Sequence, residues 1–248
     1  KNIESIQTDY QKAAKMRASF LIMGALLARC REAIIPLPGG CPIGSRPVDL
    51  HLKGFYALGC HSEQSHGFIH ICAKKLQGDK IYLDFPSVGA TENIMIAATL
   101  AKGVTTILNA AAEPEVIDLA EFLKKMGANI TGEGTSTITI TGVKKLSGTE
   151  YTVMPDRIEA GTFMIAAAIT KGDVVVENVR EKDLKPILAK LSETNVKTQK
   201  VEENAFRVYT NTKLQPVSLK TMPFPGFPTD MQAPFMSLLS VIKGTSVI

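Results

Sequence analysis

The sequence predicts an α/β or α+β protein built from a repeated unit, with apolar helices inside and sheets outside. Three Lys-Gly turns, which end at Gly103, Gly172 and Gly244, are 69 and 72 residues apart. Repeats of this length are supersecondary units that bury their apolar faces against one another. Each turn follows an apolar helical segment and precedes a short strand. We therefore expect the sheets to cover the helices.

The repeated unit is predicted to run β-α-β-α-β-β. Its clearest copy has a strand at residues 83–86, an apolar helix at 91–101, a strand at 104–108, an amphipathic helix at 114–126 and a strand at 135–141. Pro114 at the start of the amphipathic segment and Gly127 just beyond its end are typical helix boundaries. Glu121 precedes Lys125 by about one helical turn, which favours the same helix. The last segment alternates Thr or Ser with Ile, as a half-buried strand does.

The other copies are less complete. The next one has a strand at residues 153–155, a helix at 162–170 and a strand at 174–176, and the last has a loop at 228–229, a helix at 233–242 and a strand at 246–248. A degenerate earlier copy extends from residue 12 to residue 73, with an apolar helix at 16–30. The repeat thus organises almost the whole chain.

Length and composition indicate a globular protein with a sizeable core, since 45% of the 248 residues are hydrophobic. The longest apolar run, residues 20–28, ends at Arg29 and is much shorter than the roughly 20 residues that span a bilayer. No signal peptide is visible. The formal net charge is only +4, and no basic cluster is interleaved with aromatic residues. We therefore expect neither a membrane nor a nucleic acid as partner; the oligomeric state is not indicated.

The cysteines indicate free thiols. Positions 30, 41, 60 and 72 form no CxxC pair and no regular framework, which favours a reducing cytoplasm over a disulfide scaffold. A metal site can be drawn from His61, His66 and His70 together with Cys60 and Cys72. However, residues 67–72 alternate like a strand, and the usual spacing of tetrahedral zinc ligands is absent. We predict no metal.

Residues 38–51, which read PGGCPIGSRPVDLH, carry the strongest chemical signal. They place the thiol of Cys41, the guanidinium of Arg46 and the carboxylate of Asp49 on one glycine- and proline-rich loop. Such a loop allows a ligand to approach the backbone closely, and loops commonly carry reactive groups. The alternative is a surface turn with a half-buried cysteine.

Two further loops lead into apolar helices, at residues 87–89 and 229–230. The free N–H groups and the dipole at a helix N-terminus favour anions. The alternative is ordinary N-capping by Ser, Thr or Asp. Because the loops recur in the repeat, we expect them to contribute to one cleft.

Five motifs resemble, in the same order, those of the UDP-N-acetylglucosamine enolpyruvyl transferases, which belong to the EPSP synthase family. They are residues 16–19 (MRAS), 39–51, 87–91 (SVGAT), 155–162 (PDRIEAGT) and 227–233 (FPTDMQA). The resemblance implies an inside-out α/β barrel built from such units, with the active site between two domains. Residues 1–154 would form most of the first domain, and residues 155–248 part of an incomplete second one.

The resemblance also implies an activity. It is the transfer of the enolpyruvyl group of phosphoenolpyruvate to the 3-hydroxyl of UDP-N-acetylglucosamine, with release of phosphate, in the bacterial cytoplasm. This addition and elimination is the first committed step of peptidoglycan synthesis and needs no cofactor. Cys41 would be the general acid or the covalent holder of phosphoenolpyruvate and the target of fosfomycin, and Asp230 the base toward the 3-hydroxyl. The substrate-binding residues would be Arg17, Arg46, Pro47, Val48, Asp49, Leu50, Ser87, Val88, Gly89 and Thr229.

Some features depart from the family pattern. The family's N-terminal Lys-Asn pair and its C-terminal arginines are absent, so we expect the sequence to be a fragment of a longer enzyme, truncated at both ends and inactive alone. Phe85 stands where some relatives have a lysine. EPSP synthase itself shares the chemistry but lacks the cysteine loop. The alternative from another class is a catalytically incomplete fragment or module that binds the nucleotide sugar.

Overall fold

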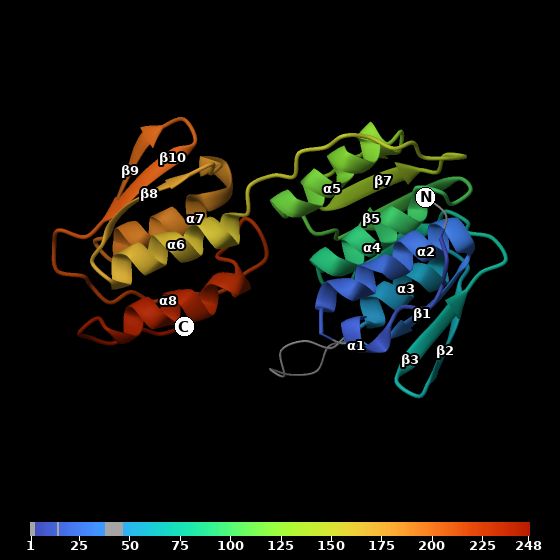
Figure 1. The fold of residues 1–248 in the computed structure, drawn as a ribbon, viewed down its shortest axis with the longest axis horizontal. Helices are drawn as coiled ribbons and strands as arrows, with labels where there is room; N and C mark the ends of the chain where they lie inside the picture. Colours follow the sequence, from blue (N-terminus) through green and yellow to red (C-terminus); the bar gives the residue numbers. More distant parts are fainter. Residues whose placement is uncertain (1–2, 14, 38–46) are drawn as a thin grey trace. The chain divides into compact units, whose positions relative to one another are not determined.

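The computed structural model describes residues 3–13, 15–37 and 47–248. The chain divides into two compact units, Lys1–Tyr151 and Thr152–Ile248 (Figure 1). Each unit has its own hydrophobic core.

Unit 1 contains two sheets. The first has the order β1-β3-β2 and consists of β1 (Glu32–Pro36), β2 (His61–Ser65) and β3 (Phe68–Cys72), all antiparallel. The second has the order β4-β5-β7-β6 and consists of β4 (Lys80–Tyr82), β5 (Val104–Leu108), β6 (Asn129–Thr131) and β7 (Thr137–Thr141). In this sheet β4 is parallel to β5, and the other pairs are antiparallel. Ile138 and Ile140 of β7 are fully buried between more exposed threonines, which confirms the predicted alternation.

The helices of unit 1 are α1 (Tyr10–Ala13), the 3-10 helix η1 (Arg17–Leu21), α2 (Ile22–Cys30), α3 (Asp49–Ala57), α4 (Val88–Ala98) and α5 (Pro114–Lys125). The central one is α4, which packs against α2, α3 and α5 (Figure 1). It is buried on almost every side, as expected for a helix that is apolar all round. The amphipathic α5 covers it with one face only.

Two glycines allow the close approach of helices to α4. A Cβ atom at Gly24 of α2 would lie 2.4 Å from the backbone oxygen of Asn93, and one at Gly54 of α3 would lie 2.2 Å from Cδ1 of Ile94. Real Cβ atoms do not come so close, so a larger residue at position 24 would push α2 away from α4, and one at position 54 would force the Ile94 side chain to move. The glycines thus set the spacing of the helix layer.

Unit 2 repeats the arrangement in part. It consists of α6 (Arg157–Ile169), β8 (Asp173–Glu177), α7 (Glu181–Glu193), β9 (Lys197–Glu202), β10 (Ala205–Tyr209), η2 (Thr229–Met231) and α8 (Gln232–Ser240). Its antiparallel sheet has the order β8-β10-β9, and α6 packs against both α7 and α8. Met164, Ile187 and Phe235 are fully buried where these three helices meet.

The predicted α/β class with a repeated unit is confirmed. The order α4-β5-α5-β6-β7 recurs as α2-β1-α3-β2-β3 in the degenerate copy and as α6-β8-α7-β9-β10 in unit 2. The strand predicted at residues 104–108 matches β5, and the amphipathic helix predicted at 114–126 matches α5 within one residue. None of the helices in the described part of the chain combines the length and apolarity needed to cross a membrane.

Several predicted elements are wrong in position. The strand predicted at residues 83–86 lies at 80–82 instead, and of the predicted residues Leu83 donates its backbone N–H to Leu108 of β5. Residues 153–155 and 246–248 form no strand, and Val247 makes a single backbone pairing, with the N–H of Leu219. The apolar helices begin earlier than predicted, since Ser87 and Asp156 cap α4 and α6. The helix predicted at 16–30 is divided into η1 and α2.

We expect Gly24→Ala to destabilise unit 1 by about 1–3 kcal/mol, because the new methyl group would clash with backbone atoms that cannot rotate away. Chemical denaturation followed by circular dichroism measures the change. Gly148→Ala is the matched control, since nothing lies within 4 Å of its added Cβ, and it should shift stability by less than about 0.5 kcal/mol. Equal stability of the two variants would contradict the role given to Gly24.

Candidate functional site

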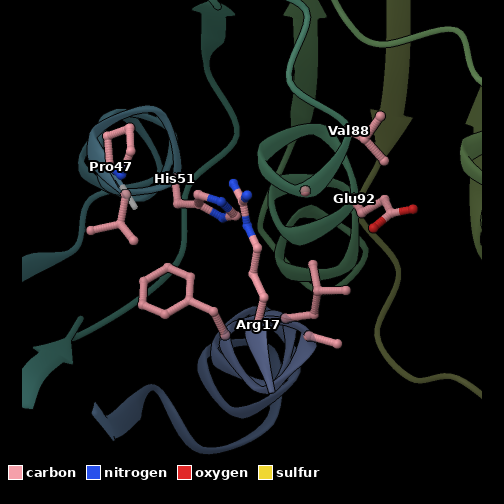
Figure 2. Close-up of a pocket in the computed structure, with 10 residues that line it drawn as sticks. Arg17, Pro47, His51, Val88 and Glu92 are labelled. Carbon is pink, nitrogen blue, oxygen red and sulfur yellow. The ribbon is translucent and has the colours of Figure 1, made fainter. Parts of the chain in front are cut away.

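A cavity of about 220 Å³ opens in unit 1 where η1, α3 and α4 meet (Figure 2). Ten residues line it: Arg17, Ala18, Phe20, Leu21, Pro47, Val48, His51, Val88, Gly89 and Glu92. They come from three separate parts of the sequence, which only the folded unit brings together. The walls combine apolar side chains with a few polar groups, the usual make-up of a ligand site.

The N-terminus of α4 forms one wall. Ser87 caps the helix, since its Oγ accepts a hydrogen bond from the N–H of Ala90 at 3.3 Å. The first N–H groups of a helix have no partner within it, so those of Val88 and Gly89 are directed to the cavity end of α4. Together with the helix dipole they favour an anion there.

Gly89 also leaves room for the His51 ring. A Cβ atom at this position would lie 3.3 Å from Cε1 and 3.5 Å from Nε2 of His51. The Nε2 edge of the imidazole therefore faces the first turn of α4. A methyl group here would already be in tight contact with the ring, so a bulkier side chain would compete with it for the same space.

His51 is largely buried on α3, where its ring meets Phe20 edge-on with ring centroids 5.0 Å apart. Burial, reinforced by the nearby positive charge of Arg17, lowers the pKa of His51 to about 4, while Asp49 raises it by a smaller amount. The imidazole is therefore neutral at pH 7. Figure 2 shows the Arg17 side chain extending from η1 toward this ring. Arg17 is itself solvent-exposed and is the positive charge at the cavity.

Asn93 supports the site from behind. Its side chain is fully buried in α4 and makes three hydrogen bonds. Oδ1 accepts from the backbone N–H of Gly24 at 2.7 Å, and Nδ2 donates to the backbone oxygen of Phe20 at 3.0 Å. Nδ2 also lies 3.1 Å from Nδ1 of His51. One amide thus joins α4 to η1, α2 and α3.

Glu92 is the acidic group of the cavity and projects from α4 on the side away from His51 (Figure 2). Burial raises the pKa of this carboxyl to about 7, and the negative charges of Glu115 and Glu113 add to the effect. Glu92 therefore changes its charge close to neutral pH.

The structure brings together part of the predicted site. Arg17, Pro47, Val48, Val88 and Gly89 all line the cavity. Asp49 is the exposed first residue of α3, Leu50 packs on the core of unit 1, and Ser87 is the cap of α4. Thr229 and Asp230 are exposed on η2 in unit 2. Cys41 and Arg46 lie outside the described residues.

Sequence reasoning missed His51, Glu92 and Asn93. A signal existed for two of them. His51 closes the cysteine-loop motif, and Asn93 is a polar residue within an otherwise apolar helix, where a buried amide needs dedicated partners. The raised pKa of Glu92 depends first on burial and then on Glu115 and Glu113, and the sequence alone indicates neither.

The histidines and cysteines of the first sheet form pairs rather than one cluster. Nε2 of His61 lies 3.1 Å from Sγ of Cys72, and Nε2 of His70 lies 2.7 Å from Oε1 of Glu32. Within the described ranges, no group of three such side chains is arranged to hold a metal ion.

The fold is that of the enolpyruvyl transferases. The crystal structure of the enolpyruvyl transferase NikO from Streptomyces tendae matches with a TM-score of 0.81, over 97% of this chain and 57% of that chain, at 21% sequence identity. An EPSP synthase from Acinetobacter baumannii matches with a TM-score of 0.58, over 89% of this chain and 51% of that chain, also at 21% identity. At these identities the likeness establishes the fold alone.

Sequence similarity shows which family the chain belongs to. Residues 1–248 match the pattern of EPSP synthase (3-phosphoshikimate 1-carboxyvinyltransferase), and the chain belongs to this family. It is 58% identical over 247 residues to UDP-N-acetylglucosamine 1-carboxyvinyltransferase 2 of Carboxydothermus hydrogenoformans, covering 99% of this chain. It is also 58% identical over 247 residues to UDP-N-acetylglucosamine 1-carboxyvinyltransferase 1 of Caldanaerobacter subterraneus, covering 100% of this chain. The chain spans 59% of the length of each of these relatives. The predicted resemblance is confirmed.

We expect Glu92→Gln to change how stability depends on pH. A carboxyl whose pKa is raised on folding favours the folded state below its unfolded pKa, and this contribution is lost as the pH rises toward 7. The variant should therefore be more stable than the unaltered chain at pH 8, by about 1–3 kcal/mol, and equal to it near pH 4.5. Urea denaturation at several pH values measures the difference. Glu63→Gln, on the exposed face of β2, is the control, and a pH-independent difference for Glu92→Gln would contradict the assignment.

Proposed function

We propose that the protein transfers the enolpyruvyl group of phosphoenolpyruvate to the 3-hydroxyl of UDP-N-acetylglucosamine, with release of phosphate. The observation that supports this most strongly is the cavity of unit 1, where the N-terminus of α4 and the Arg17 side chain meet. An anion-binding cavity is what a doubly charged diphosphate requires. The names and 58% identity of the relatives support UDP-N-acetylglucosamine as its source.

In this proposal the diphosphate lies against the first turn of α4. Ser87, Val88 and Gly89 supply the helix N-terminus, and Arg17 supplies the charge. Pro47 and Val48 form the apolar wall toward the nucleoside, and Asp49 and Leu50 follow them at the start of α3. The helix dipole and the cation thus bind the diphosphate, and the apolar surface binds the nucleoside.

The chemistry is assigned to Cys41 and Asp230, with Arg46 and Thr229 as further substrate contacts. Addition delivers a proton to the methylene carbon of phosphoenolpyruvate while the sugar hydroxyl attacks the neighbouring carbon. Elimination then removes a proton from the new methyl group and expels phosphate. Cys41 acts as the acid or as the covalent holder of phosphoenolpyruvate, and Asp230 as the base toward the 3-hydroxyl. No cofactor takes part in this scheme.

The proposal extends to the biological setting. The reaction is the first committed step of peptidoglycan synthesis in the bacterial cytoplasm and serves cell-wall biogenesis. We further propose that residues 1–154 belong to the first of two enolpyruvyl transferase domains and residues 155–248 to the second. The activity is that of the whole protein, since the chain spans 59% of the length of its relatives.

Release of phosphate from phosphoenolpyruvate that depends on UDP-N-acetylglucosamine is the direct test of the reaction. Binding of UDP-N-acetylglucosamine without any such release would instead favour a nucleotide-sugar-binding module. That alternative draws on the same cavity, because the groups assigned to the diphosphate, Arg17 and the α4 N-terminus, bind an anion without any chemical step.

We expect fosfomycin to add to Cys41 only, and faster when UDP-N-acetylglucosamine is present, because a reactive thiolate opens epoxides readily. Intact-protein mass and peptide mapping detect the adduct. Cys60 should not react, since burial, with Cys72 nearby, raises the pKa of its thiol to about 12. Cys41→Ser is the control and should show no adduct. Labelling spread over Cys30 and Cys72 would contradict the assignment.

We expect Arg17→Ala to weaken the binding of UDP-N-acetylglucosamine by about 10- to 100-fold, the usual loss for a charged hydrogen bond to an anion. Isothermal titration calorimetry at low salt measures the dissociation constant. Arg29→Ala, also exposed but at the opposite end of α2 from η1, is the matched control for the loss of one positive charge. Equal weakening by both variants would indicate a general charge effect and not a site.

A further inference from the structure

We propose that Asn93 is a positioning residue, whose side-chain amide holds the His51 ring in the tautomer that carries its proton on Nε2 and directs this N–H to the anion bound at the start of α4. The part that concerns the anion rests on the proposed function. The part that concerns the tautomer rests on hydrogen bonds of the described residues alone.

The hydrogen bonds of Asn93 leave only one way to place the protons. Oδ1 accepts from the backbone N–H of Gly24, which identifies the oxygen of the amide. Nδ2 has two hydrogens and no lone pair to offer, and its two neighbours are the backbone oxygen of Phe20 and Nδ1 of His51. Nδ1 must therefore accept, so the single proton of the neutral ring is on Nε2.

The surroundings of His51 keep the ring neutral. The charged groups that act on it are Arg17 from η1 and Asp49 on α3 itself, while Glu92 of α4 lines the same cavity but projects away from the ring. Burial and Arg17 lower the pKa of His51 to about 4, and Asp49 opposes them only in part. A neutral ring has one N–H to give, and Asn93 decides which nitrogen carries it.

The geometry shows where that N–H points. Nε2 of His51 lies 3.5 Å from the position that a Cβ on Gly89 would occupy, and His51 lines the cavity together with Gly89 and Val88. The ring thus adds a fixed donor beside the free N–H groups of the α4 N-terminus. A donor held in place by a buried partner loses little entropy when the anion binds.

Asn93→Asp tests this inference with almost no change in shape. The carboxylate still accepts from Gly24, but toward His51 it can only accept, so the proton should move to Nδ1 or the ring should become doubly protonated. Long-range 15N–1H correlation spectra of histidine-labelled protein at pH 7 report which nitrogen carries the proton, with His51→Gln to assign the signal. Asn109→Asp, in the same unit but bonded to the backbone oxygen of Leu83, is the matched control and should leave His51 unchanged.

Binding gives the second measurement. Inorganic diphosphate and UDP-N-acetylglucosamine serve as separate probes in calorimetry, and we expect Asn93→Asp to weaken both by about 10-fold or more. The glutamine of His51→Gln carries its own N–H and needs no tautomer. In that background Asn93→Asp should therefore have little further effect, which a purely structural role of Asn93 would not produce.

Each possible result of these experiments supports or overturns a stated part of the inference. A proton on Nδ1 of His51 in the unaltered protein would overturn the inference, and this measurement holds even if Asn93→Asp fails to fold. An altered tautomer in Asn93→Asp with unchanged diphosphate binding would overturn the positioning role. Diphosphate binding without UDP-N-acetylglucosamine binding would overturn the proposed function but not the role of Asn93. That role would then be decided by comparing diphosphate binding to the unaltered chain and to Asn93→Asp.

Discussion

The buried amide of Asn93 is the interaction on which the arrangement of unit 1 depends. A fully buried amide costs about 1–3 kcal/mol if it is left unpaired, so α4 can occupy the centre only where partners are supplied. They come from Gly24, Phe20 and His51, on three different elements. The same bonds that satisfy the amide therefore hold η1, α2 and α3 at fixed positions around α4. Those elements are the walls of the cavity.

Small residues make this arrangement possible. Gly24 brings the backbone of α2 within reach of Asn93, and Gly89 leaves space for the His51 ring at the cavity. A side chain at position 24 would move α2 away from Asn93, and a bulky one at position 89 would crowd the His51 ring. Stability and the shape of the binding surface are thus set by the same contacts, and a change in one affects the other.

The helix α4 and its counterpart α6 in the repeat differ in how their N-termini are capped. Asp156 caps α6 with two short hydrogen bonds, 2.8 Å to the N–H of Ile158 and 3.1 Å to that of Glu159. A carboxylate therefore already satisfies the dipole of that helix. At α4 the cap is the neutral hydroxyl of Ser87, with one longer bond of 3.3 Å. The α4 N-terminus keeps its preference for an external anion.

Patterns in the sequence alone were enough to predict the repeat and the class of the fold, and the resemblance added five of the ten residues that line the cavity. Lys-Gly turns, apolar helices and the Thr/Ile alternation of β7 are local signals, and each reflects an interaction within a few residues. The tertiary structure decided what depends on neighbours distant in the chain. The strand at residues 80–82 formed where β5 offered a partner, and Lys124, not Lys125, pairs with Glu121 because Glu133 from the β6–β7 turn also contacts it. The neutral charge of His51 and the raised pKa of Glu92 likewise arise from burial and from charges on other elements, which no local pattern contains.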